Sequence, residues 1–324
     1  MKHGAVSITA REHAELVEVS YSQTLGADEV MGRTVCTLIS PGTELAWNYK
    51  GNSFPSFPGY AAVFEAEEIG SEVKNVTTGG LYFCMGPHRS FQKTNAMDVF
   101  PVPPGLSPQE AVLARLMGVS MTTLATTAAR PGDRVLVTGA GPVGYMAAQI
   151  FAISGYDVMV AEPDETRRRN IVQSGIKKVF SDIPHNDPDI AGTVALVAEC
   201  SGYEQPAIDG CKVVRKRGEV VLIGVPWLRH SDSSAHELLS LVFHKYVILR
   251  SGWEWEFSKY ATDQTPHSLN TGFATALRWL AEGRVKTDGL IKQFSPDDCQ
   301  SVYNNLLHGK SEGLFAIFDW AHNL

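Results

Sequence analysis

The stretch Val135-Leu136-Val137-Thr138-Gly139-Ala140-Gly141-Pro142-Val143-Gly144 decides the fold of this chain. A short apolar run leads into the pattern G-x-G-x-x-G, and residues 145–154 continue as an apolar helix. In a strand, glycine turn and helix of this kind, the glycines allow a tight turn, close approach of a pyrophosphate and close packing of helix on strand. The phosphates lie where free amides and the positive helix end converge. We therefore predict a dinucleotide site at Gly139, Gly141, Pro142, Val143 and Gly144.

An acidic residue at a suitable distance supports this prediction. The next apolar run, 158–161, ends in Glu162, 23 residues after Gly139, close to the spacing at which a carboxylate binds the adenosine ribose. A carboxylate accepts both ribose hydroxyls and repels a 2′-phosphate, so NAD is predicted in preference to NADP. Arg167, in the basic run 167–169, is a counterweight, because a guanidinium can clamp a 2′-phosphate. The alternative for this run is a solvated helix face.

Apolar runs and helical stretches alternate from Arg134 onward, with runs at 135–137, 158–160, 195–197 and 220–223. Continuous apolar strands separated by helices are typical of a doubly wound parallel sheet. The first hundred residues instead contain short runs at 17–19, 35–39, 62–66 and 81–84, which predict a strand-rich domain. A proline-rich segment, 100–105, precedes a helical pattern that begins after Ser107. The closing apolar run, 315–318, could rejoin the first domain.

Length, charge and cysteine content limit the class of protein. A chain of 324 residues is long enough for two domains. Its 28 basic and 35 acidic residues give a net charge of −7, so no global field attracts nucleic acid or an anionic membrane. Five cysteines without a C-x-x-C pair favour a reducing cytoplasm. The uncharged stretch 135–156 is long enough to suggest a membrane span, but its glycines favour a strand, a turn and a helix.

Five motifs spread over nearly the whole chain resemble the medium-chain dehydrogenase/reductase family. They are Ile39-Ser40-Pro41-Gly42-Thr43-Glu44, Phe57-Pro58-Gly59-Tyr60-Ala61, Pro131-Gly132-Asp133-Arg134 with the strand that follows, Glu199-Cys200-Ser201-Gly202, and the stretch 218–226. The resemblance implies an α/β fold, in which a Rossmann domain (113–267) is inserted into a GroES-like, β-rich catalytic domain (1–112 and 268–324). It also implies that Gly202, Gly224 and Val225 face the cofactor, and that the protein is a homodimer or homotetramer.

The chain departs from the family pattern at the positions of the zinc ligands. Zinc-using members place a cysteine, a histidine and a third ligand at positions that here hold Pro41, Tyr60 and Arg115. Proline has no ligand atom, tyrosine is a poor substitute for histidine, and a guanidinium repels zinc. We therefore expect no zinc. The variant motif resembles a zinc-lacking branch that includes bacteriochlorophyllide dehydrogenase-like proteins.

Four residues are candidates for the chemistry in the absence of zinc. Tyr60 is expected either to donate a hydrogen bond or proton to the substrate oxygen, with a cation such as Arg115 favouring its ionised form, or only to fill the vacated site. Thr43 stands at the position of the hydroxyl that relays the substrate proton in the family. We expect its side chain either to have that role or to shape its own turn through a hydrogen bond. His88 follows a glycine-proline turn, and we expect it to be either a catalyst or a loop residue. Glu44 is expected to pair with a cation, Arg115 being one candidate.

These observations lead to one principal prediction and two alternatives. The principal prediction is a zinc-independent oxidoreductase that transfers a hydride between NAD(H) and an alcohol or carbonyl substrate. The first alternative is a quinone or enoyl reductase that uses NAD(P)H. The second is a protein that binds the dinucleotide but has lost catalysis and has a structural or regulatory role. In each case we expect a small-molecule ligand, with neither nucleic acid nor membrane as a partner.

Overall fold

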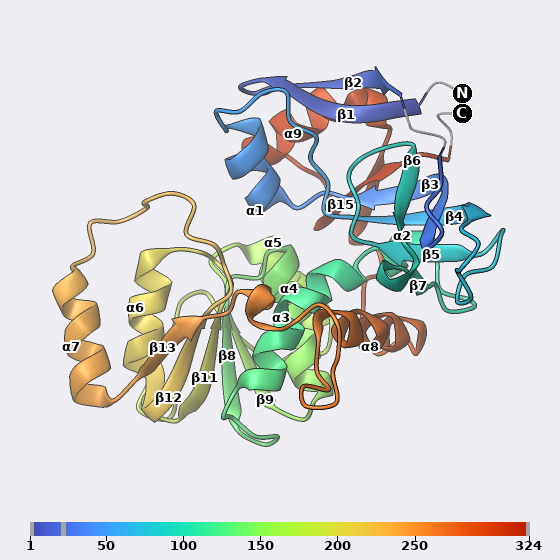
Figure 1. Ribbon diagram of the computed structural model, residues 1–324. Helices are drawn as coiled ribbons and strands as arrows, with labels where there is room; N and C mark the ends of the chain where they lie inside the picture. Colours follow the sequence, from blue (N-terminus) through green and yellow to red (C-terminus); the bar gives the residue numbers. More distant parts are fainter. Residues whose placement is uncertain (1–2, 21–23, 322–324) are drawn as a thin grey trace. The chain divides into compact units, whose positions relative to one another are not determined.

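The computed structural model describes residues 3–20 and 24–321 of the chain (Figure 1). These residues form two compact units. The first contains the described residues up to Arg115, residues 277–282 and the described residues from Thr287 onward, and the second contains residues 116–276 and 283–286. The chain leaves the first unit inside the helix that starts at Ala114, whereas the expected boundary lies at 112/113. On the return, residues 268–276 still belong to the second unit.

The second unit is built on a parallel sheet with the strand order β10-β9-β8-β11-β12-β13, whose arrows lie side by side in Figure 1. Val135, Leu136 and Val137 of β8 are completely buried, as an uninterrupted apolar run predicts for a strand covered on both faces. The strands are β8 (Arg134–Thr138), β9 (Asp157–Ala161), β10 (Lys178–Phe180), β11 (Val194–Glu199), β12 (Val214–Leu222) and β13 (Ile248–Ser251). The helices around them are α3 (Ala114–Thr126), α4 (Pro142–Ile153), α5 (Glu165–Gln173), α6 (Glu204–Val213), α7 (Ala235–Lys245), η3 (Glu254–Glu256) and α8 (Leu269–Ala281).

The strand order reverses at β8. From β8 the chain continues to β9 and β10 on one side, and then crosses to β11, β12 and β13 on the other side. At such a switch point the loops that follow adjacent strands diverge and leave room for a ligand. Thr138 at the end of β8 is paired with Ala161 of β9 and with Glu199 of β11, so three strand ends meet at this edge. The topology therefore puts the glycine turn at the binding edge of the sheet.

The first unit is a strand-rich domain whose sheet uses both ends of the chain. Seven strands share the order β14-β15-β3-β4-β5-β7, with β6 paired to β3, and β1 and β2 form a separate antiparallel pair. The strands are β1 (His3–Ala10), β2 (His13–Val19), β3 (Glu29–Leu38), β4 (Ala61–Ile69), β5 (Leu81–Cys84), β6 (Phe91–Asn95), β7 (Phe100–Pro101), β14 (Ile291–Phe294) and β15 (Phe315–Asp319). The helical segments are α1 (Pro41–Thr43), η1 (Glu44–Tyr49), η2 (Ala96–Asp98), α2 (Pro108–Ala111), η4 (Pro296–Asp298) and α9 (Cys299–Leu307).

The C-terminal segment rejoins the first unit through β15. Ile317 and Phe318 of β15 pair antiparallel with Leu38 and Thr37 of β3. Tyr303 of α9 packs in the same buried cluster as Phe318, next to residues of β1 and η1. Burial of these large aromatic side chains fastens the two chain ends together, since each full burial stabilises by about 2–3 kcal/mol.

The element types predicted for the runs quoted above are confirmed, with one difference in the helices. The helical pattern after Ser107 is divided into α2 and α3 by a turn at residues 112–113. The uncharged stretch 135–156 is divided between β8, the glycine turn and α4. Across residues 3–20 and 24–321, no helix has both the length and the hydropathy that crossing a lipid bilayer requires.

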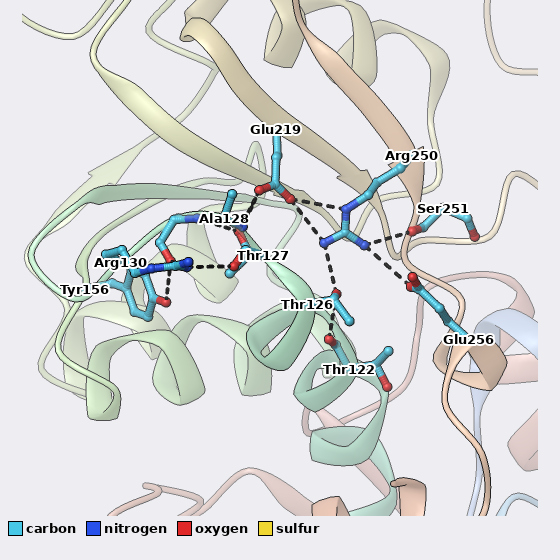
Figure 2. A network of polar contacts seen from close by, with 11 residues as sticks. Thr122, Thr126, Thr127, Ala128, Arg130, Tyr156, Glu219, Arg250, Ser251 and Glu256 are labelled. Atoms are coloured by element: carbon cyan, nitrogen blue, oxygen red, sulfur yellow. Dashed lines mark hydrogen bonds and ion pairs between the residues drawn. The ribbon is translucent and has the colours of Figure 1, made fainter. Parts of the chain in front are cut away.

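A buried ion pair connects two strands of the second unit to the end of α3. Figure 2 shows the Glu219 carboxylate of β12 between Arg250 of β13 and the segment that follows α3. Its Oε2 accepts hydrogen bonds from Nε and Nη2 of Arg250 at 3.2 and 3.1 Å. Its Oε1 accepts from the Ala128 amide at 2.5 Å and from the Thr127 hydroxyl at 3.2 Å. Glu219 is 4% exposed, so water cannot replace these donors.

Replacing Glu219 with Ala tests this junction. The substitution leaves the Ala128 amide and part of the Arg250 guanidinium without their buried acceptor, and we expect the free energy of unfolding to fall by about 2–3 kcal/mol. Glu256 also lies near Arg250, at 3.6 Å, but its side chain is half exposed. Glu256→Ala is therefore the control, with an expected loss within about 0.5 kcal/mol. Urea unfolding of the full chain measures both, and equal losses would contradict this account.

Candidate functional site

The turn between β8 and α4 needs glycine at two positions. Gly139 has φ +80°, a conformation that side chains with a Cβ rarely adopt. A Cβ on Gly144 would lie 1.8 Å from the carbonyl oxygen of Gly139, so only glycine lets the first turn of α4 pack so closely on the end of β8. These two residues give the strand-to-helix connection its shape.

Gly141 differs from both, because the space beside it is open. Apart from its chain neighbours and the backbone of α4, the described residues bring one atom within 4 Å of a Cβ placed there, Nη1 of Arg167 at 3.9 Å. Gly141 is the N-cap of α4 and offers no side chain to the first-turn amides, and Pro142 is at the first helical position. Gly141, Pro142 and Val143 are all partly exposed. Free amides, the positive end of a helix and an open approach fit the pyrophosphate of a dinucleotide.

Glu162, the predicted ribose ligand, follows β9 and holds the glycine turn. Its Oε2 accepts a hydrogen bond from the Ala140 amide at 2.5 Å, and its Oε1 accepts from the Asp164 amide at 2.9 Å. The residue is 2% exposed. A carboxylate has about four acceptor positions, so the two amides do not use all of its lone pairs, and ribose binding by Glu162 stays a prediction. The structure thus adds a main-chain role that the sequence spacing does not reveal.

The three arginines of the basic run lie in different surroundings. Nη1 of Arg168 donates to the main-chain carbonyls of Glu162 and Pro163, and Arg169 pairs with Glu165 on the same helix. Arg167 reaches back toward the glycine turn, where its Nη1 lies 3.9 Å from Oε2 of Glu162. Of the three, Arg167 is therefore the one placed to meet the adenosine end of a dinucleotide.

The predicted cofactor contacts on β11 and β12 meet after the strand ends. Gly202 has φ +74°, and a Cβ there would lie 2.6 Å from the carbonyl oxygen of Val225. A Cβ on Gly224 would lie 2.3 Å from the amide nitrogen of Gly202. The two loops therefore pack backbone against backbone. Val225 is 46% exposed beside them, which leaves its side chain accessible to a ligand.

Glu199, at the end of β11, organises the same edge and was not among the predicted site residues. Its carboxylate accepts from the amides of Ser201 and Gly202 at 2.7 and 3.0 Å, from the Ser201 hydroxyl, and from the Thr138 hydroxyl at 3.2 Å. Burial raises the pKa of Glu199 above its ordinary value, and these hydrogen bonds act in the opposite direction. An acidic residue directly before Cys-Ser-Gly in an otherwise apolar strand was the available signal.

In the first unit the structure brings Tyr60 and Arg115 together. The Arg115 guanidinium carbon lies 4.0 Å from the centre of the Tyr60 ring, in a cation–π stack. Arg115 is 4% exposed and Tyr60 is partly exposed. The expected pairing is therefore present, with the cation against the face of the ring.

Thr43 and Glu44 lie at the junction of α1 and η1. Thr43 is partly exposed and ends α1, while the Glu44 side chain is directed into the core. Oε1 of Glu44 accepts a hydrogen bond from the Ser40 amide at 2.7 Å, which closes the turn that carries Thr43. Oε2 of Glu44 lies 3.0 Å from Nε2 of His88 and 2.5 Å from the Tyr303 hydroxyl.

His88 is completely buried, with 0% exposure. Its Nδ1 lies 2.7 Å from the Thr37 hydroxyl and its Nε2 contacts Glu44, so both ring nitrogens have partners. The Phe318 ring meets it edge-on at 5.0 Å. His88 therefore contacts the core of the unit, and its catalytic role stays a prediction.

The chain is similar in sequence to several known dehydrogenases, although no protein-family model matches it. L-galactonate-5-dehydrogenase of Escherichia coli is 28% identical over 201 residues, which cover 59% of this chain and 53% of that enzyme. L-threonine 3-dehydrogenase of Pyrococcus abyssi is 28% identical, over 65% of this chain and 72% of that enzyme. The chain thus spans about half the length of the first of these relatives.

Solved structures are similar over nearly the whole chain. Galactitol-1-phosphate dehydrogenase from Escherichia coli matches with a TM-score of 0.83 at 15% identity, covering 98% of this chain and 100% of that one. 2R,3R-butanediol dehydrogenase from Bacillus subtilis matches with a TM-score of 0.78 at 15% identity, covering 98% and 99%. The chain has the medium-chain dehydrogenase fold. Together, the named relatives and structural neighbours indicate a medium-chain oxidoreductase.

The sequence resemblance predicts that Pro41, Tyr60 and Arg115 stand at the zinc-ligand positions of the family. In the structure, Tyr60 and Arg115 contact each other. In the part of the chain that the structure describes, no three His, Cys, Asp or Glu side chains are grouped to hold a metal ion.

Two glycine substitutions separate the predicted dinucleotide binding from folding. In Gly141→Ala the new methyl group fits the protein, so stability should change by no more than about 1 kcal/mol. The methyl group occupies the approach of the pyrophosphate, and we expect the Kd for NADH to rise about a hundredfold, or about 2.7 kcal/mol. Gly144→Ala should instead destabilise the fold, because its Cβ meets the Gly139 carbonyl. Fluorescence titration and thermal unfolding measure the two effects, and unchanged NADH binding in Gly141→Ala would refute the assignment.

Proposed function

We propose that this chain is a zinc-independent, NAD-dependent oxidoreductase that transfers a hydride between the nicotinamide and an alcohol or carbonyl substrate. The open space beside Gly141 at the start of α4 carries the proposal, since a dinucleotide requires this geometry. Bound there, the nicotinamide cofactor supplies the hydride acceptor or donor. Curated relatives are named for L-galactonate, L-threonine and D-arabinitol, which favours a hydroxyl-bearing substrate.

A preference for NAD over NADP follows from the charge at Glu162. Its buried carboxylate lies at the end of β9, where the adenosine ribose is expected, and it would repel a 2′-phosphate. Arg167 is the nearby cation, but its guanidinium is already 3.9 Å from the same carboxylate. The pair together presents little net positive charge to a phosphate.

The stack of Arg115 on Tyr60 supports chemistry without zinc. Hydride transfer changes the charge on the substrate oxygen, and an oriented hydrogen-bond donor can stabilise that charge in place of a metal. We assign this role to the Tyr60 hydroxyl. Arg115 holds the ring and favours the ionised phenol when a proton is passed on. Thr43, partly exposed on its turn, is assigned the proton relay.

Turnover by the wild type and by Tyr60→Phe tests the function. The wild type should bind NADH more tightly than NADPH and should act on at least one of L-galactonate, L-threonine, sorbitol and D-arabinitol. In Tyr60→Phe we expect kcat to fall by about 100- to 1000-fold, because the donor to the substrate oxygen is lost, while the Kd for NADH is unchanged. Tyr260→Phe, at an exposed tyrosine of the second unit, is the control.

Three outcomes of this assay would contradict the proposal in different ways. Turnover of enones or quinones only would support the reductase alternative. Tight NADH binding without turnover of any compound would support the catalytically inactive alternative. Near-wild-type turnover of Tyr60→Phe would show that the tyrosine only fills space.

We also propose that two copies pair along the edge of the parallel sheet. Among the strands of residues 3–20 and 24–321, β13 pairs with β12 alone, so it forms an edge of the parallel sheet. Next to it, Phe243 of α7 is 77% exposed, Tyr246 is 67% exposed and Ile248 of β13 is 43% exposed. Apolar side chains of this size beside an open strand edge suit a second copy of the same chain, because a twofold axis lets one edge pair with itself.

Phe243→Glu tests this pairing. A carboxylate in the proposed interface is costly to bury, so we expect the dimer to dissociate at micromolar concentration, while thermal stability of the subunit is retained. Val172→Glu on α5, where Val172 is 52% exposed, is the matched control. Sedimentation velocity measures the mass of each variant. A monomeric wild type, or a Phe243→Glu variant with the wild-type mass, would refute the proposal.

A further inference from the structure

A buried chain of hydrogen bonds crosses the first unit and includes His88. It runs from Trp320 Nε1 to the Thr37 hydroxyl at 3.0 Å, on to Nδ1 of His88 at 2.7 Å, and from Nε2 of His88 to Oε2 of Glu44 at 3.0 Å. The Tyr303 hydroxyl reaches the same carboxylate oxygen at 2.5 Å. All five residues are at most 2% exposed. The chain therefore exchanges no hydrogen bonds with bulk water.

The chemistry of these groups sets the direction of the hydrogen bonds at both ends of the chain. The indole nitrogen of Trp320 can only donate, so the Thr37 oxygen accepts from it, and the hydroxyl can pair with Nδ1 of His88 in either direction. At the other end, Nε2 of His88 faces the Glu44 carboxylate, whose oxygens accept, and it donates to that group. Burial raises the pKa of Tyr303 well above its ordinary value, and the Glu44 carboxylate adds to this, so the phenol remains protonated and donates as well. Every polar atom of the chain is satisfied in this pattern.

The main chain of His88 holds a second segment, the one that carries Tyr60. The His88 amide donates to the carbonyl oxygen of Pro58 at 2.9 Å. Gly59 lies so close that a Cβ there would be 2.4 Å from the His88 amide nitrogen and 2.3 Å from the Pro87 Cα. Its φ of +143° is also a conformation for glycine. The residue directly before Tyr60 is therefore clamped against His88.

The side chain of His88 holds the turn that carries Thr43. Through Nε2 it contacts Glu44, whose other oxygen accepts the Ser40 amide and closes that turn. His88 is thus one hydrogen bond away from each of two segments, Ser40–Glu44 and Pro58–Tyr60, which are separated in sequence. Each segment contains a residue to which the proposed function gives a role, Thr43 in the first and Tyr60 in the second.

We infer that His88 is a positioning residue that sets the distance between Thr43 and Tyr60. The inference rests on the proposed function for the roles of those two residues, but the coupling itself is a property of the fold. His88 does not touch the substrate, since it is completely buried. In a zinc enzyme, the metal ion would hold the same two segments together through its ligands. Here the contacts of His88 link them, because its imidazole contacts the Glu44 carboxylate and its main-chain amide donates to the Pro58 carbonyl.

Two amide substitutions divide the contacts of the imidazole. In His88→Gln the side-chain amide reaches about as far as Nε2 and can still donate to Glu44. In His88→Asn it reaches only about as far as Nδ1, which keeps the Thr37 contact and breaks the one to Glu44. The two variants are matched in polarity and differ by one methylene. A role in stability alone would make the Gln and Asn variants behave alike, whereas a positioning role makes them differ.

The first readout is the position of Tyr60 itself, which needs neither cofactor nor turnover. In protein labelled with ¹³C at the tyrosine Cζ, the Tyr60 signal is assigned by its absence from Tyr60→Phe. We expect His88→Asn to shift this signal, because the Pro58–Tyr60 segment loses its link to Glu44, and His88→Gln to keep it near the wild-type value. Thr37→Val, which breaks the other end of the chain, is the control and should keep it too.

The second readout is turnover of the best substrate from the panel above. We expect kcat of His88→Asn to fall about 100-fold, because misplacing catalytic groups by about 1 Å costs that much. The Kd for NADH should not change, and the primary isotope effect with C4-deuterated NADH should increase as hydride transfer becomes slower. A loss of folded protein alone would lower the rate without changing the isotope effect. His88→Gln should remain close to the wild type in all three measurements.

The outcomes separate this inference from the proposed function. If no panel compound is turned over, the function fails, while the Tyr60 signal still decides whether His88 couples the two segments. An unshifted signal and unchanged kcat in folded His88→Asn would overturn the inference. Should that variant not fold, Glu44→Ala against Tyr303→Phe makes the same comparison: the first cuts the link to His88, and the second removes only the other donor.

Discussion

A backbone carbonyl occupies the place where a side chain would begin at residue 144, and the architecture of the second unit depends on this contact. The Gly139 oxygen lies 1.8 Å from the position of a Cβ at Gly144, so α4 can start directly on the end of β8 only because both residues are glycine. The helix then presents its first amides at the edge where β9 and β11 also end. A bulkier connection would move the helix outward and separate these elements.

Buried carboxylates maintain the loops around that edge. Glu162 and Glu199 each accept main-chain amides from a neighbouring turn, and Glu44 does the same in the first unit. Burying a carboxylate is costly unless donors surround it, and the least mobile donors available are main-chain amides. Each carboxylate therefore stabilises one conformation of its loop. Thr43 and Gly141, which are both partly exposed, lie on turns whose shape these buried carboxylates determine.

Organic contacts link distant segments of the first unit. Arg115 lies on the ring of Tyr60, and a buried chain of hydrogen bonds runs from Trp320 to Glu44. A zinc ion would bind side chains from several segments directly. Here the same segments are held by aromatic packing, a buried imidazole and glycine contacts, which are rigid because they exclude water.

The sequence by itself determined the fold class, the parallel sheet with its glycine turn and the departure from the zinc-ligand pattern, because each depends on local patterns: apolar runs, glycine spacing and residue identity. The fold also explains why Gly139, Gly141 and Gly144 differ in function, although the motif treats them alike. Only the tertiary structure decided that Glu162 ties down the turn, that Glu199 organises the neighbouring loop and that His88 lies in the core. The contacts of Glu162 and of the chain around His88 join residues far apart in sequence, such as Glu162 with Ala140 and Glu44 with Tyr303, and no local pattern encodes which distant groups will meet. Glu199 holds its own loop through the nearby amides of Ser201 and Gly202, but its contact with Thr138 is also distant in sequence.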